Sequence, residues 1–353
     1  MYCCSNCFKD TELIGFIFSN STETSKCDFC GTENTKVIDP RELEELFQPL
    51  VNLYKPNSEI GIEVAEPKLF HEKIQESWQI FNINDSALVK KLSDSILSGI
   101  YAPDNPFLNT PVEVAALFEK SSPAEIHEQR WDNFAEEIKY KNRYFLNETV
   151  DLELLKILLS SLAKIYNPGK IFYRGRISDL KALPIEQMGK PPFDKATSGR
   201  ANPNGIPYLY VATTLETTVY ESRASYLDFL SIAEFKLKGN LNVISLREVS
   251  KISPFVLGDN LENYIIHQKY LARLEMELSK PVRRFDKELD YLPSQYLCEY
   301  VKSLGYDAIE YGSSLNIGGV NLAIFNDTKL EARTVEVYEI SSVNLDFRKL
   351  VVT

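Results

Sequence analysis

The chain has 353 residues, of which 44% are apolar and 25% are charged; this composition is typical of a folded globular protein and excludes a fibre or a disordered tail. Its 39 Lys and Arg residues are outnumbered by 50 Asp and Glu residues, a net charge of −11, which argues against a nucleic-acid groove as the main site but still permits a small arginine pocket. Neither a run of about 18 apolar residues nor a basic-then-apolar start occurs, so we expect a soluble, cytoplasmic protein without a membrane span or secretion signal.

Two C-x2-C pairs lie near the N-terminus. Cys4 and Cys7 form the first pair and Cys27 and Cys30 form the second, with nineteen residues between the pairs. This spacing can direct four thiolates at one tetrahedral ion, so it predicts structural Zn2+ held by these four residues. Cys3 is adjacent to Cys4 and is an alternative to it as a ligand. Disulfides are disfavoured without a secretion signal, and a redox pair would need a βαβ context.

Residues 1–38 are therefore expected to form a zinc-knuckle segment. The apolar run at 13–18 predicts a small β-ribbon between the two cysteine pairs. Gly31 follows the second pair, at a position where a positive φ is often required. A closed site of four cysteines stabilises structure and leaves no open coordination position for catalysis.

Residues 39–167 have the pattern of a helical domain. Asp39, Asp85 and Asp151 each precede apolar residues at helical spacing, as N-cap residues do. The last of these helices is expected over 151–166. Some helical ribonuclease bundles use an arginine followed by a histidine, but none of the three histidines here has an arginine five to seven residues before it, which argues against that function. A scaffold or regulatory domain is the preferred interpretation.

Residues 168–353 alternate strand-like runs with helical stretches. The predicted strands cover 170–174, 208–212, 232–237, 241–246, 320–325, 334–339 and 343–352, and the predicted helices cover 215–224 and 294–304. The usual dinucleotide, P-loop, hydrolase and metalloprotease motifs are missing from the sequence. These patterns predict a second, mixed α/β domain whose chemistry depends on a less common set of residues.

Such a set recurs along the second half of the chain as short polar motifs in a fixed order. The motifs are Tyr173-Arg174, Gly199-Arg200-Ala201-Asn202, Tyr210, Glu221, Gly305 to Ser313, and Gly319 to Asn321. In order and spacing they resemble the RES domain, a bacterial toxin family named for arginine, glutamate and serine. Ala201 departs from the family pattern, in which a large aromatic residue often stands there. The cysteine pairs and helices before them resemble the HEPN/RES-type N-terminal domain that often precedes RES domains.

The resemblance implies an ADP-ribosyltransferase-like fold that binds NAD+ as its substrate and degrades it by hydrolysis or phosphorolysis. It also implies a toxin or defence effector with an antitoxin or regulatory protein as partner. If the resemblance holds, Arg174 and Arg200 bind the pyrophosphate of NAD+ through forked, charge-assisted hydrogen bonds, and Ser313 donates a further hydrogen bond to the substrate. Tyr210 stacks on the nicotinamide or its ribose. Glu221 opposes the positive charge that develops on the ribose when the glycosidic bond breaks.

We therefore predict an α+β protein with a zinc-knuckle segment (1–38), a helical N-terminal domain (39–167) and a RES domain (168–353). The predicted catalytic residues are Glu221, Arg174 and Tyr210, and Asn202 joins the binding residues or only shapes its turn. ADP-ribosyl transfer to a protein and a non-catalytic NAD sensor remain alternative functions. The N-terminal region either restrains the enzyme or mediates homo-oligomerisation.

Overall fold

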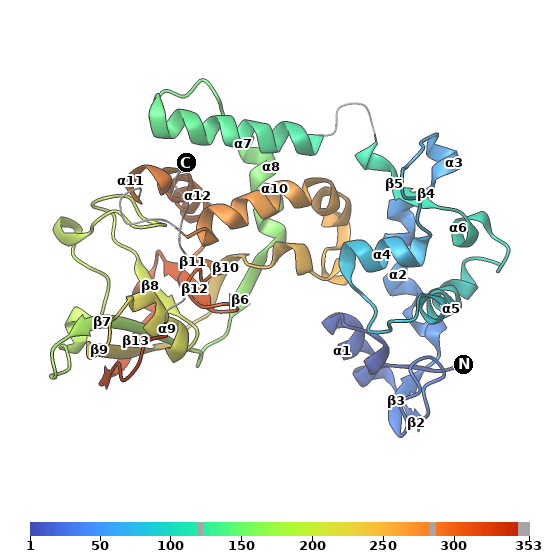
Figure 1. The fold of residues 1–353 in the computed structure, drawn as a ribbon, viewed down its shortest axis with the longest axis horizontal. Coiled ribbons are helices and arrows are strands. Elements are labelled where there is room, and N and C mark those ends of the chain that lie inside the picture. The colour runs from blue at the N-terminus through green and yellow to red at the C-terminus, as the bar shows by residue number, and fades with distance from the viewer. Residues whose placement is uncertain (119–122, 282–286, 345–353) are drawn as a thin grey trace. The chain divides into compact units, whose positions relative to one another are not determined.

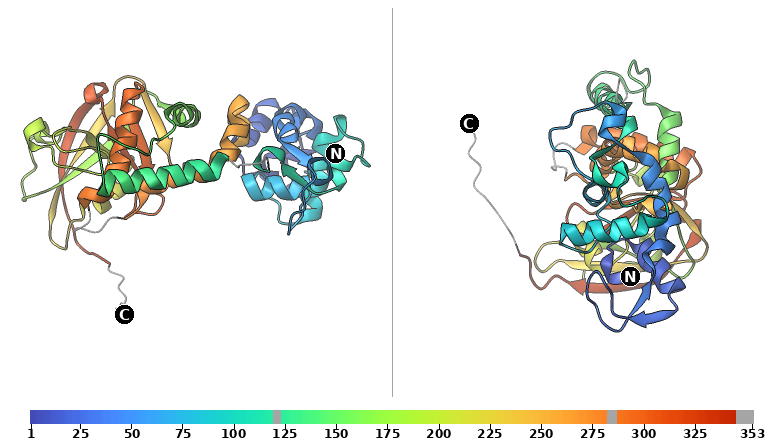
Figure 2. Two further views of the ribbon diagram at one scale, coloured as in Figure 1. Left: turned by 90° about the horizontal axis from the view of Figure 1, so that it is seen from above. Right: turned by 90° about the vertical axis from the view of Figure 1, so that its right-hand side faces the viewer.

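The computed structural model describes residues 1–118, 123–281 and 287–344, so all but the first two residues of the strand predicted at 343–352 lie outside the described residues. Its contacts divide the chain into two compact units (Figures 1 and 2). The N-terminal unit contains Met1–Ile126 and Val249–Tyr270, and the C-terminal unit contains His127–Glu248 and the chain from Leu271 onward. No described helix is long and apolar enough to cross a membrane.

The N-terminal unit is mostly helical. Its helices are α1 (Thr11–Asn20), α2 (Glu44–Leu53), α3 (Asn57–Ile60), α4 (Phe70–Trp78), α5 (Ser86–Ile96) and α6 (Pro106–Asn109). Its short strands are β1 (Cys3–Cys4), β2 (Glu23–Ser25), β3 (Thr35–Ile38), β4 (Tyr54–Pro56) and β5 (Val112–Val114). The caps predicted at Asp39 and Asp85 are confirmed, because the Asp39 side chain accepts from the backbone N–H of Arg41 and that of Asp85 from Ala87.

The ribbon predicted at 13–18 is wrong, because these residues lie in helix α1. The carboxylate of Asp10 accepts hydrogen bonds from the backbone N–H groups of Glu12 and Leu13, which caps the helix. Leu13 and Ile17, four residues apart, are fully buried on one face of this helix. The ribbon is built instead by β1, β3 and β2, in that order, around the cysteine pairs.

The core of the N-terminal unit includes residues from far along the chain. Phe255 packs against Phe47 of α2 with ring centroids 5.1 Å apart, and Tyr264 stacks on Trp78 of α4 at 5.6 Å. Tyr264 belongs to α10 (Leu261–Ser279), whose first part lies in this unit and whose second part lies in the C-terminal unit. The segment 249–270 thus completes a core that begins some 200 residues earlier.

The C-terminal unit is built on one eight-stranded sheet with the order β13-β9-β7-β8-β12-β11-β10-β6. The strands are β6 (Ala163–Tyr166), β7 (Ile171–Ser178), β8 (Leu209–Ala212), β9 (Phe229–Leu237), β10 (Leu241–Leu246), β11 (Ala308–Gly312), β12 (Val320–Ile324) and β13 (Leu330–Glu339). Neighbouring strands are antiparallel except β10 and β11. Apolar side chains such as Phe172, Val243 and Leu322 form the buried core of this sheet. The presence of a helical N-terminal unit and of a C-terminal unit built on a mixed sheet confirms the predicted α+β class.

The described helices of this unit are α7 (Pro123–Tyr140), α8 (Leu152–Ser161), α9 (Leu215–Ser222), α11 (Lys287–Asp290) and α12 (Leu292–Ser303), together with the second part of α10. α9 packs against β7, and α12, orange in Figure 2, packs against β11. The turn before α12 and the loop before β8 both contribute residues to the cavity of this unit.

The helix predicted over 151–166 is correct only in its first part. Asp151 caps α8 as expected, accepting from the backbone N–H of Leu154, but the helix ends at Ser161. The next residues form β6 and pair with β10. Lys164 and Tyr166 both reach the buried carboxylate of Glu310 from this strand. The apolar pattern of these residues also fits a helix, but their pairing with β10 and their contacts with the buried Glu310 make them a strand.

Candidate functional site

A cavity of about 410 Å3 lies in the C-terminal unit. Its walls come from β7, β8, β11, β12, α9 and the loop before β8. Arg174, Arg200, Tyr210 and Glu221 line it together, although nearly fifty residues separate the first from the last. The other two side chains singled out from the sequence, Asn202 and Ser313, do not line the cavity and act on residues that do.

Arg174 on β7 brings an uncompensated positive charge to the cavity wall. Its Nη1 donates to the backbone carbonyl of Tyr210 at 3.3 Å, whereas its buried Nε has no hydrogen-bond partner. No carboxylate among the described residues forms an ion pair with it. Burial, together with the nearby charge of Arg176, lowers the pKa of Arg174 to about 10. A desolvated guanidinium with a free N–H donor is suited to bind an anion.

Arg200 lies in the loop before β8 and approaches the same cavity. Its Nη1 donates to the backbone carbonyl of Lys280 at 2.7 Å, directly after the end of α10. Its guanidinium carbon lies 5.6 Å from the ring centroid of Tyr291, over the ring face. Lys280 and Tyr291 thus fix one donor and one face of the guanidinium, while its other donors have no described protein partner.

Tyr210 on β8 forms a wall of the cavity and also holds the loop that carries Arg200. Its hydroxyl donates to Oδ1 of Asn202 at 2.7 Å and accepts from the backbone N–H of Ala201 at 3.0 Å. Asn202 is only 4% exposed, and its amide nitrogen donates to three backbone carbonyls, those of Thr197, Pro203 and Ile206. The structure therefore uses the Asn202 side chain to shape the loop, the second of the two roles considered from the sequence.

A substitution at Gly199 tests whether this loop has room to move. A Cβ atom there would lie 2.5 Å from Oδ1 of Asn202 and 2.7 Å from the hydroxyl oxygen of Tyr210. We expect Gly199→Ala to lower the free energy of unfolding by about 1–3 kcal/mol, because it overpacks a bonded pair. Gly189→Ala is the matched control, since its nearest neighbouring atom would be 4.0 Å away. Thermal unfolding of the two variants checks this, and equal melting temperatures would contradict it.

Glu221 on α9 is the carboxylate of the cavity and is exposed at its mouth. Its Oε1 accepts from Oγ of Ser313 at 2.6 Å and from Nδ2 of Asn321 at 2.7 Å. Its Oε2 has no hydrogen-bond partner among the described residues. Ser313 therefore orients Glu221, and it is the neighbouring Ser314 that lines the cavity. A carboxylate held by two donors on one oxygen keeps the other oxygen available for a ligand.

Three further residues line the cavity: Asn321 and Tyr311, to which the sequence assigned no role, and Arg223, which the sequence suggested as a supporting or surface residue. Asn321 and Tyr311 face each other across β12 and β11, so their side chains share one face of the sheet. Both residues lie within the motifs that resemble the RES domain, Gly305 to Ser313 and Gly319 to Asn321, and that position could have identified them. Arg223 closes α9 in a left-handed conformation with φ of 51°, which is unusual for a residue with a side chain. This backbone conformation distinguishes Arg223 in the structure, and no pattern in the sequence predicts the conformation.

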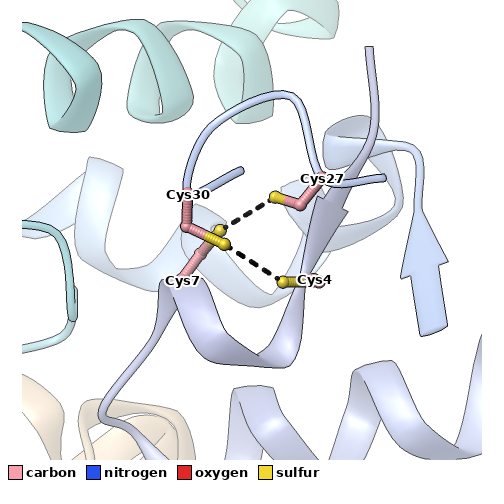
Figure 3. Close-up of side chains that lie close together, drawn as sticks. All are labelled: Cys4, Cys7, Cys27 and Cys30. Atoms are coloured by element: carbon pink, nitrogen blue, oxygen red, sulfur yellow. Dashed lines mark hydrogen bonds between the residues drawn. The ribbon is translucent and has the colours of Figure 1, made fainter. Parts of the chain in front are cut away.

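The cysteine pairs of the N-terminal unit form a second candidate site (Figure 3). The Sγ atoms of Cys4, Cys7, Cys27 and Cys30 all lie within 4.8 Å of one another. The pairs Cys4–Cys30 and Cys7–Cys27 are 3.4 Å apart, far longer than a disulfide bond. Four thiolates at about 2.3 Å from one ion would be about 3.8 Å apart, so this arrangement fits a tetrahedral metal site.

The local backbone supports the same geometry. Gly31 has φ of 74°, the positive value expected after the second cysteine pair. Its N–H donates to the carbonyl of Cys27, which closes the turn. The hydroxyl of Thr32 lies 3.1 Å from Sγ of Cys30. Cys3 is buried on β1 and does not belong to the group of four.

Two protein families match this chain. The RES domain matches residues 176–347, and HEPN/RES N-terminal domain 1 matches residues 20–151. Among solved structures, the M. tuberculosis MbcT–MbcA toxin–antitoxin complex aligns with 15% identity and a TM-score of 0.31, covering 53% of this chain and 92% of that one. No curated protein matches. The RES match spans Arg200, Tyr210 and Glu221 and begins two residues after Arg174.

Proposed function

Because this chain is a RES-domain protein with a HEPN/RES N-terminal domain, we propose that its cavity binds NAD+ and breaks the bond between nicotinamide and ribose. The family resemblance read from the sequence motifs is confirmed by both matches. In the cell, the consequence of this activity would be depletion of NAD, as in a toxin or defence effector. The proposal rests on the cavity residues and on the family together.

The observation that carries the proposal is the charge of the cavity. Arg174 is half-buried, has no carboxylate partner among the described residues and has a buried Nε donor without a hydrogen bond, and Arg200 lines the same cavity with donors that have no described partner. NAD+ carries a pyrophosphate with two negative charges, and guanidinium groups bind such oxygens through charge-assisted hydrogen bonds. A bound pyrophosphate would give the Nε of Arg174 the hydrogen-bond acceptor that it lacks in the protein alone. A protein of net charge −11 can hold this anion because the positive charge is local.

Glu221 then serves the chemical step. When the bond between ribose C1′ and the nicotinamide nitrogen breaks, its electron pair leaves with nicotinamide, and positive charge develops on the ribose. The carboxylate of Glu221 stabilises that charge and can hold a ribose hydroxyl or the incoming nucleophile through Oε2. Water attacking C1′ gives ADP-ribose and a proton, whereas phosphate gives ADP-ribose 1″-phosphate. The residues of this chain suffice for the step, since cationic nicotinamide is already a good leaving group.

Transfer to a protein is the second candidate function, and one observation favours it. Glu221 is exposed at the cavity mouth, so a side chain of another protein has access to the reacting carbon. The products decide between the reactions. We expect purified full-length protein with NAD+ to release nicotinamide together with free ADP-ribose, or with its 1″-phosphate when phosphate is added. Label from adenine-labelled NAD+ that remains on protein would instead support transfer, and bound but intact NAD+ would support a sensor.

We also propose that the four clustered cysteines hold one structural Zn2+ per chain. The Sγ separations fit four thiolate ligands and leave no open coordination position, so the ion would fasten the β1, β2 and β3 ribbon. We expect Cys4→Ser to lose the metal and Cys3→Ser to retain it. Metal analysis of the two purified variants checks this assignment. Equal zinc content in both would contradict it and would point to Cys3 as a substitute ligand.

The N-terminal unit is the proposed place of regulation. A zinc-stabilised helical unit carries no described residue of the cavity, because all cavity residues belong to the C-terminal unit. We propose that this unit, which contains most of the HEPN/RES N-terminal match, restrains the enzyme by itself or through a bound antitoxin or other regulatory protein. Homo-oligomerisation through the same unit stays a prediction.

A further inference from the structure

The loop that carries Arg200 is fastened by the beginning of α12. The hydroxyl of Ser294 donates to the backbone carbonyl of Arg200 at 2.6 Å and also lies within hydrogen-bond distance of the carbonyl of Tyr291, at 2.9 Å. The amide nitrogen of Gln295 donates to Oγ of Ser198 at 2.8 Å and to the carbonyls of Gly199 at 2.8 Å and Asn202 at 3.1 Å. Ser294 is fully buried and Gln295 is 4% exposed. Two buried polar side chains in one helical turn thus form hydrogen bonds with the same five-residue segment, 198–202, of the loop before β8.

The same region also holds the end of the Arg200 side chain. Tyr291, the residue that immediately precedes α12, lies under the guanidinium and lines the cavity beside it. The carbonyl of Tyr291 accepts from the backbone N–H of Gln295 at 2.8 Å, so the ring is joined directly to the turn that holds the loop. The carbonyl of Lys280 accepts from Nη1 on the edge of the guanidinium. Backbone and side chain of Arg200 are therefore both fixed before any ligand binds.

Such fixing matters because arginine is long and loses much rotamer freedom when it binds a phosphate. Arg174 lies on strand β7, where its Nε is buried and its Nη1 donates to the carbonyl of Tyr210, whereas Arg200 lies on a loop. We propose that Tyr291, Ser294 and Gln295 are positioning residues that hold Arg200 in the geometry for binding the substrate's pyrophosphate. This inference rests on the proposed function, and it assigns a role to residues outside every motif that marked the cavity.

A pair of matched serine variants of the full-length protein tests it. Ser294→Ala removes the bond to the carbonyl of Arg200 together with the contact to the carbonyl of Tyr291. Ser231→Ala is the control, because Ser231 is equally buried and also has two hydrogen-bond partners, Leu183 and Ser178, outside the cavity. We expect Ser294→Ala to weaken ADP-ribose binding about tenfold in calorimetry, since the arginine is no longer pre-organised. Ser231→Ala should leave the binding constant unchanged, even if both variants melt at lower temperature.

The ring of Tyr291 gives a second, independent measurement. Tyr291→Phe keeps the aromatic face under Arg200 and should bind ADP-ribose within about twofold of wild type, whereas Tyr291→Leu removes the face and should bind several-fold more weakly. A purely structural role would give equal affinities for Ser294→Ala and Ser231→Ala, and for the two Tyr291 variants, and would overturn the inference. If wild type binds ADP-ribose without consuming NAD+, the proposed reaction fails while the positioning role stands. If wild type does not bind ADP-ribose, both fail.

Discussion

Glu221→Gln is expected to lower the rate of NAD+ cleavage at saturating NAD+ by a factor of about 100 or more. Glutamine keeps an oxygen that can accept from Ser313 and Asn321, so the side chain should stay in place. What it loses is the negative charge that opposes the developing positive charge on the ribose. Binding of ADP-ribose, which carries no cationic leaving group, should change by less than about threefold because the positive charge arises only during bond breaking.

Glu216 supplies the control for this substitution. It lies on the same helix, α9, and is exposed outside the cavity. Glu216→Gln makes the same chemical change and should leave the rate of nicotinamide release unaltered. Steady-state rates and ADP-ribose binding measured on both variants separate the two cases. Equal activity of Glu221→Gln and wild type would remove Glu221 from the reaction.

Arg174→Met is expected to weaken ADP-ribose binding by about a hundredfold while leaving the melting temperature at or above that of wild type. The loss of affinity follows from removing charge-assisted hydrogen bonds to the pyrophosphate. The gain in stability follows from the sign of the pKa shift. A base whose pKa is lowered by folding, here to about 10, destabilises the folded state at every pH below that value. Methionine of similar length removes this penalty, which is on the order of 3 kcal/mol.

Arg176 provides the comparison, two residues along the same strand. It is exposed, does not line the cavity, and donates to the backbone carbonyl of Gln187. Arg176→Met should change ADP-ribose affinity by no more than about threefold. Calorimetry and thermal unfolding of the two variants give both quantities. A less stable Arg174→Met protein with wild-type affinity would show that Arg174 is a structural residue.

The sequence could indicate the cavity because its signals are local and ordered. Arg174, Arg200, Tyr210 and Glu221 each stand in a short motif, and they meet because β7, β8 and α9 are consecutive along the chain and packed together. The cysteine pairs are equally local. The roles of single residues were harder to predict. Asn202 and Ser313 both lie in the motifs, but their contacts are visible only in the structure: Asn202 holds its loop, and Ser313 orients Glu221.

Long-range pairing lay beyond what the sequence pattern could show. Residues 163–166 read as the end of a helix because their apolar pattern fits one, and the partner that makes them a strand, β10, begins 75 residues later. The segment 249–270 belongs to the core of the N-terminal unit although it lies inside the RES match. Ser294 and Gln295 likewise act on backbone groups more than 90 residues away. No periodicity or short motif encodes such contacts.

The most direct test of the whole account is to follow NAD+ by proton NMR in the presence of the purified full-length protein. If the cavity breaks the glycosidic bond, signals of free nicotinamide appear as those of the nicotinamide riboside group disappear at an equal rate, and Glu221→Gln slows both. If NAD+ stays intact with folded protein that binds ADP-ribose, the cavity recognises the dinucleotide without cleaving it, and the proposed reaction is contradicted.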